Sequence, residues 1–141
     1  MNSAIGSTVI PKHFSASIGG AMDGYYHLEL HNGTLTYIDP NRPVTRKGRI
    51  KIRPTAKQWR EFRQALDDLN IWQWQTHFRS RAVDGTQWTL DISYDEKAIK
   101  TFGDNSYPDA AGKPNNKPGY TATFNRYLDA IKKLIDGRNF N

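Results

Sequence analysis

Hydrophobic and polar residues alternate in several short runs, and this two-residue period is typical of strands that bury one face. One such run is YYHLELHNGTLTYID, residues 25–39. Its Asn32-Gly33 pair favours a two-residue hairpin turn, because both residue types tolerate the positive φ of a type I′ turn. In that register Leu28 lies opposite Tyr37. The hairpin would bury one row of side chains: Tyr26, Leu28, Leu30, Leu35 and Tyr37.

The segment KGRIKIR, residues 47–53, alternates in the same way and predicts a third strand. Its two isoleucines would face the core, and its outer face would carry Arg49, Lys51 and Arg53. Because residues two apart on a strand are separated by about 6.8 Å, these cations would form an evenly spaced row. Pro54 would end the strand.

A second hairpin is predicted for residues 87–102, with its turn near Asp95. In this register Asp91 lies opposite Lys100 on the polar side, where opposite charges add a small stabilisation. The buried side of its first strand would carry Trp88, Leu90, Ile92 and Tyr94.

Two segments have the helical period of apolar residues, which predicts helices over about 56–69 and 122–136. Thr55 and Gln58 form a capping-box pattern at the start of the first helix. The second helix begins after an N-cap at Thr121 or Thr123, two candidates that the pattern does not separate. Gly137 would end it.

The predicted order of elements is β-β-β-α-β-β-α, which indicates an α+β fold. We expect an antiparallel sheet of about five strands, two hairpins plus one strand, with two helices packed on one face. Residues 25–137 would form the single domain, preceded by an N-terminal arm or edge strand in residues 1–24. Residues 103–120 hold three prolines and three glycines, so they predict a long loop.

The chain has 141 residues and no cysteine, which excludes disulfides and thiolate metal ligands. Residues 1–14 lack the basic start and apolar run of a signal peptide. All apolar runs are far shorter than the ~20 residues of a membrane-spanning helix. We expect a cytoplasmic protein with no membrane partner and no cofactor. A signal upstream in a longer chain would change that expectation, and the oligomeric state stays open.

The net charge of +6 is concentrated in one part of the chain. Residues 42–81 carry eleven basic and three acidic residues, a net charge of +8, whereas residues 82–141 carry eight of each. Such a basic segment suits an anionic partner, either an acidic protein or a nucleic acid. A solvated outer sheet face would produce the same pattern without a partner.

A metal site is not favoured by the spacing of the histidines. His27, Glu29 and His31 share one strand face, but the two histidines would lie about 13 Å apart on a regular strand. That separation is too long for one ion, and a zinc site needs three or four ligands.

Recognisable catalytic motifs are absent from the sequence, which contains no Gly-rich phosphate loop, nucleophile elbow or cysteine nucleophile. Acids and bases that could serve a small hydrolase are His77, Asp84, Asp91, Asp104 and Asp109. Two of them, Asp84 and Asp104, stand at turn positions that acids occupy for backbone reasons.

Six short motifs occur in order along residues 25–137, including D-G-x-x-W-x-L-x-I-x-Y at 84–94 and I-K-x-F-G-x-N-x-Y-P at 99–108. The others are G-x-L-x-Y at 33–37, K-G-x-I at 47–50, F-x-x-A-L-x-x-L-x-I-W-x-W at 62–74 and F-x-x-Y-L-x-A-I-x-x-L at 124–134. This ordered set resembles a domain family of small bacterial proteins of unknown function. The resemblance implies the order of elements and a bacterial or phage setting, and it implies no catalytic residue.

The first functional hypothesis is a small, non-enzymatic protein-binding module of the immunity or inhibitor type, with an acidic protein as its partner. The second is nucleic-acid binding through residues 42–63, and the third is a small hydrolase. Tyr107 would pin the loop against the core, because Pro108 keeps it out of the helical region. The candidate contact residues are Arg49, Lys51, Arg53, Arg60, Asp104, Asn105, Tyr107, Lys113 and Lys117.

Overall fold

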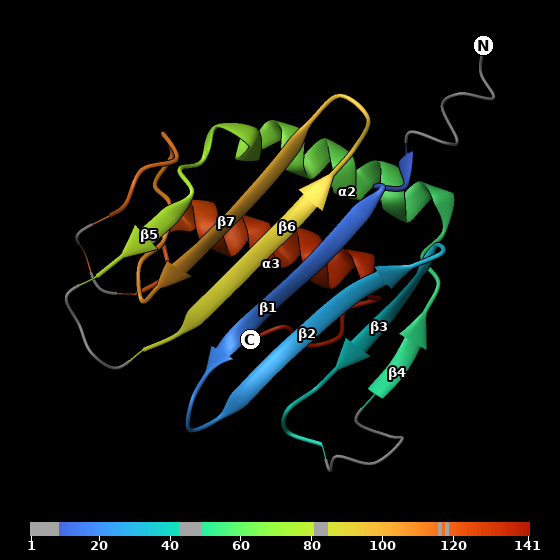
Figure 1. The fold of residues 1–141 in the computed structure, drawn as a ribbon, viewed down its shortest axis with the longest axis horizontal. Helices are drawn as coiled ribbons and strands as arrows, with labels where there is room; N and C mark the ends of the chain where they lie inside the picture. Colours follow the sequence, from blue (N-terminus) through green and yellow to red (C-terminus); the bar gives the residue numbers. More distant parts are fainter. Residues whose placement is uncertain (1–8, 43–48, 81–84, 116, 118) are drawn as a thin grey trace.

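A seven-stranded sheet with two helices on one face forms the fold of the computed structural model, which describes residues 9–42, 49–80, 85–115, 117 and 119–141. Figure 1 looks onto the uncovered face of the sheet, with both helices behind it. The elements are β1 (His13–Gly20), β2 (Gly24–His31), β3 (Thr34–Ile38), β4 (Arg49–Ile52), α2 (Ala56–Asp68), the 3₁₀ helix η2 (Ile71–Gln73), β5 (His77–Arg79), β6 (Gln87–Ser93), β7 (Ala98–Asp104) and α3 (Ala122–Leu134).

The α+β class and the placement of both helices on one face are confirmed. The prediction of about five antiparallel strands is wrong in detail. The strand order is β4-β3-β2-β1-β6-β7-β5, and β5 pairs with β7 in parallel, so the sheet is mixed. β5 has three residues, and a strand that short leaves no readable period in the sequence.

The largest correction concerns the N-terminal segment, where an arm or an edge strand was expected. His13–Gly20 forms β1, which lies in the middle of the sheet between β2 and β6. Its inward side chains are buried, but after His13 its outward residues are only serine and glycine, so the alternation of apolar and polar residues is weak in the sequence. Gly19 permits the close approach to β2, since a Cβ there would lie 2.0 Å from the carbonyl oxygen of Gly24.

Both predicted hairpins form in the predicted register. Leu28 lies opposite Tyr37, and the turn residues Asn32 and Gly33 have φ of 51° and 79°, as a type I′ turn requires. In the second hairpin, between β6 and β7, Asp91 lies opposite Lys100, and their charged groups are 3.7 Å apart. Local alternation and turn chemistry were enough to specify these pairs.

The helix caps also follow the sequence. Thr55 accepts a hydrogen bond from the Gln58 backbone N–H, and the Gln58 side chain accepts one from the Thr55 N–H, which completes the capping box. At α3 the N-cap is Thr121, whose hydroxyl accepts the Phe124 N–H. Neither helix in the described part of the chain has the length and apolar character needed to cross a bilayer.

Aromatic side chains dominate the layer between the sheet and the helices. Trp88 of β6 has its ring centroid 5.0 Å from that of Phe124 on α3 and 6.2 Å from that of Trp74 after η2. The C-terminal tail closes one end of this layer, because Phe140 is fully buried and the Tyr37 hydroxyl donates to the Asn139 carbonyl.

Alkaline pH should destabilise the fold through its buried tyrosines. Burial is the main cause that raises the pKa of five of them, and it raises that of Tyr37 to about 12. In the unfolded chain a tyrosine ionises near pH ~10, so the folded state holds these protons more tightly. The free energy of unfolding should therefore fall as pH rises from about 10 to about 12. The five are Tyr26, Tyr37, Tyr94, Tyr107 and Tyr127.

Urea unfolding at about pH 8, 10 and 11 measures this effect. Tyr37→Phe removes one of the five protons, so its stability should decline less steeply than that of the unmodified protein. Equal slopes for the two proteins would contradict the assignment to Tyr37.

Candidate functional site

The cations predicted on the third strand lie together at one edge of the sheet. β4 is the outermost strand and pairs with β3, so that Lys51 is opposite Thr36 and Arg49 is opposite Ile38. Because Ile52 points to the core, the alternating cations project from the uncovered face and are exposed. We call Arg49, Lys51 and Arg53 the basic edge.

The charge of the basic edge is not neutralised by carboxylates of the described residues. Among the residues that the structure describes, none of its three cations forms an ion pair, and Arg53 donates instead to the Thr34 hydroxyl at 3.1 Å. The carboxylate nearest to Lys51 along its cross-strand row is Glu29, two strands away, and it lies 3.6 Å from His31. The row therefore presents net positive charge to solvent.

A pocket of about 390 Å³ lies beside β4 on the helix side of the sheet. Tyr37 and Ile50, which are cross-strand partners, form its sheet wall. The C-terminal tail forms another wall, and Arg42 lies at the pocket with its guanidinium 3.9 Å from Asp39. The lining residues are Tyr37, Asp39, Arg42, Ile50, Gly137, Arg138 and Asn139.

Arg60 does not join the basic edge. It is exposed on α2, in the helical layer that covers the opposite face of the sheet. The predicted basic segment 42–63 is therefore divided between two faces of the molecule, and its residues 43–48 lie outside the described residues.

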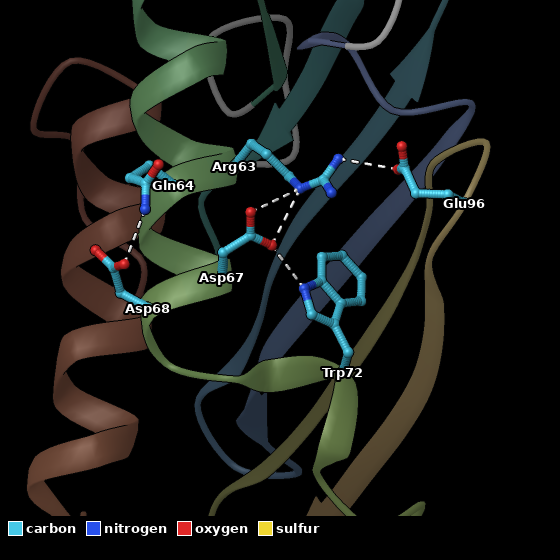
Figure 2. Close-up of polar contacts among 6 residues, drawn as sticks. All are labelled: Arg63, Gln64, Asp67, Asp68, Trp72 and Glu96. Carbon is cyan, nitrogen blue, oxygen red and sulfur yellow. Dashed lines mark hydrogen bonds and ion pairs between the residues drawn. The ribbon is translucent and has the colours of Figure 1, made fainter.

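Arg63, at the end of the basic segment, forms ion pairs with carboxylates of the protein itself (Figure 2). Its Nε lies 3.1 and 3.2 Å from the two carboxylate oxygens of Asp67, and its Nη1 lies 3.2 Å from Oε1 of Glu96 in the β6–β7 turn. The Trp72 indole donates to the same Asp67 carboxylate at 2.8 Å. Helix α2, the turn at η2 and the second hairpin thus meet at one guanidinium.

The guanidinium also packs on aromatic rings, with its carbon 4.4 Å from the Tyr94 ring centroid and 5.6 Å from that of Trp72. Burial acts to lower the pKa of Arg63, but Asp67 and Glu96 together raise it above its ordinary value. Arg63 is a structural cation and is not available to an external anion.

The first part of the predicted loop site has an architectural role. Asn105 has φ of 50°, and its N–H donates to the Thr86 carbonyl at 2.7 Å. The backbone carbonyl of Ser106 accepts a hydrogen bond from the Trp88 indole N–H at 2.9 Å. Tyr107 is buried against Phe124, with ring centroids 4.8 Å apart, so the prediction that it pins the loop to the core is confirmed.

The later loop residues Lys113 and Lys117 are exposed, but they are far from the basic edge. The loop follows β7, and four strands lie between β7 and β4. At about 4.8 Å per strand, β7 and β4 are about 24 Å apart. They cannot form one compact site, which corrects the expectation that the basic strand and the loop act together.

Asp104 ends β7 and contacts His77 of β5, with Oδ2 and Nε2 3.2 Å apart. The imidazole stacks on Phe102 at 4.2 Å between ring centroids. A histidine oriented by a carboxylate can act as a general base. Of the other acids considered for hydrolysis, Asp84 lies outside the described residues, and Asp91 contacts His13 at 3.2 Å.

The contact between His13 and Asp91 was missed in the sequence, because it depends on the pairing of β1 with β6. All four histidines project from the uncovered face, since each alternates with a core residue on its strand. Within the described part of the chain, no three histidine or carboxylate side chains gather as a metal site.

No model of a known protein family matches the chain, and no curated protein matches it. The resemblance to the small bacterial domain family therefore stays a prediction. The geometry of the molecule carries the functional argument.

Replacing Arg63 should destabilise the protein, while replacing Arg60 should not. Arg63→Ala leaves the half-buried Asp67 carboxylate without its cation and is expected to cost ~1–3 kcal/mol of unfolding free energy. Arg60→Ala, on the exposed side of the same helix, should stay within ~0.5 kcal/mol.

Urea denaturation curves of the two variants provide the measurement. Arg63→Lys is a second test, because it keeps the charge but loses the planar fork and should fall between the two. Equal midpoints for Arg63→Ala and Arg60→Ala would refute the structural role.

Proposed function

We propose that this chain is a small, non-enzymatic binding module of the immunity or inhibitor type, and that its basic edge binds an acidic protein partner. The observation that carries the proposal is a row of three exposed cations at the sheet edge, Arg49 and Lys51 on β4 and Arg53 directly after it, with no ion-pair partner among the described residues. Unpaired surface cations at even spacing favour an anionic partner and speed its association.

A protein partner is favoured over a nucleic acid by the charges further along the uncovered face. Glu29 and Asp91 lie on the same cross-strand row as Lys51, and although Lys100 lies 3.7 Å from Asp91, both carboxylates would face a polyanion that crosses the sheet. A partner held at the edge strand avoids both carboxylates. The cation row is also short, three residues at about 6.8 Å spacing, which suits a short acidic segment.

The test compares two charge reversals of equal size on different surfaces. One variant carries Arg49→Glu, Lys51→Glu and Arg53→Glu at the basic edge. The matched control carries Arg60→Glu, Arg126→Glu and Lys133→Glu, all exposed positions on the helices. Fluorescence anisotropy at physiological salt measures the binding of labelled poly-L-glutamate and of a single-stranded oligonucleotide to each protein.

We expect the basic-edge variant to bind poly-L-glutamate at least about tenfold more weakly than the unmodified protein. The helix control should stay within about threefold. Equal losses in both variants would show that net charge alone drives binding and would refute the site. Tighter binding of the oligonucleotide, with a steep dependence on salt, would establish nucleic-acid binding in place of the proposed partner.

A further inference from the structure

We infer that β4 accepts an extended acidic segment of the partner as an added strand, so that the partner becomes the eighth strand of the sheet. This inference rests on the proposed function and specifies how the partner is held. Recognition would combine backbone hydrogen bonds with an alternating pattern of side chains.

The first support is the position of β4. In the described sheet it pairs with β3 on one side and forms the edge on the other. In an antiparallel ladder, alternate residues direct their N–H and C=O groups away from the partner strand. The outer side of β4 therefore offers donors and acceptors that a further strand can satisfy.

The second support is that the two faces of β4 differ in character, so an added strand with matching side chains on each face would be preferred. On the uncovered face the cations repeat every second residue, so the facing strand would place carboxylates at every second position. On the helix side the same strand would direct its other side chains toward the 390 Å³ pocket beside Ile50 and Tyr37. The preferred segment alternates acidic residues with small or apolar residues.

The charge of the basic edge argues against a second copy of this chain as the occupant. If two β4 strands paired about a two-fold axis centred on Lys51, Arg49 would lie opposite Arg53 and the two lysines would lie opposite each other. Like charges directly opposite destabilise a strand pair. Charged residues on an edge strand are a known protection against self-association, and here they select an acidic partner.

Three labelled heptapeptides built from glutamate and valine test the inference on the full chain. The first peptide alternates glutamate and valine, and the second has the same composition arranged in two blocks. The third is the alternating peptide with N-methyl groups on every second amide, so that one edge of the extended peptide cannot donate backbone hydrogen bonds. Anisotropy gives the affinity of each peptide. Amide hydrogen exchange, followed by NMR, reports on residues 49–52.

We expect the alternating peptide to bind about tenfold more tightly than the block peptide, and N-methylation to remove that advantage. Bound alternating peptide should slow exchange of the outward-facing amides of β4. The variant with Arg49→Glu, Lys51→Glu and Arg53→Glu should lose both the tighter binding of the alternating peptide and the slowed exchange of the β4 amides.

Equal affinity for all three peptides without amide protection would overturn strand addition, while binding by charge and the proposed function would stand. No binding of any peptide, together with no binding of poly-L-glutamate, would overturn both. Amide protection that grows with protein concentration in the absence of peptide would show that a second copy occupies the edge and would overturn the inference.

Discussion

The pairing of β1 with both of its neighbours is the constraint on which the rest of the molecule depends. β1 hydrogen-bonds to β2 on one side and to β6 on the other, so it joins the two hairpins into one sheet. Without it, each hairpin would have a polar outer face and an unsatisfied edge. The continuous sheet then gives α2 and α3 a single apolar surface to cover, and the aromatic layer fills the space between them.

The molecule uses its basic residues in two different ways. Arg63 is drawn inward, where two carboxylates and two aromatic rings surround it and tie α2 to the β6–β7 turn. The three cations of the basic edge have no such partners among the described residues and remain exposed. The position of each cation relative to the core therefore decides whether it stabilises the fold or is available to a partner.

The two edges of the sheet are not equivalent, and they differ in how far their side chains are engaged by other parts of the protein. At the opposite edge, β5 is three residues long, and His77 is engaged by Asp104 and Phe102. The neighbouring loop is held by the buried Tyr107 and by Gly112, which lies against Trp74. The side chains near that edge are engaged by the protein itself, whereas the cations beside β4 have no ion-pair partner among the described residues.

The sequence by itself determined the features that depend on neighbouring residues. The turn at Asn32 and Gly33 set the register of the first hairpin, and the pair Thr55 and Gln58 set the start of α2. In each case the interacting groups lie a few residues apart, so the local pattern contains the physical information. The outward direction of the basic edge followed from the same alternation.

Only the tertiary structure decided what depends on pairing between distant segments. It placed β1 at the centre of the sheet, added β5 in parallel, and set Gly112, in the loop that follows β7, against Trp74 and away from β4. It also brought the half-buried Arg63 into contact with Glu96, 33 residues away in the sequence. Strand order and long-range ion pairs depend on which hydrophobic faces combine in three dimensions, and a one-dimensional period of apolar residues does not record that choice.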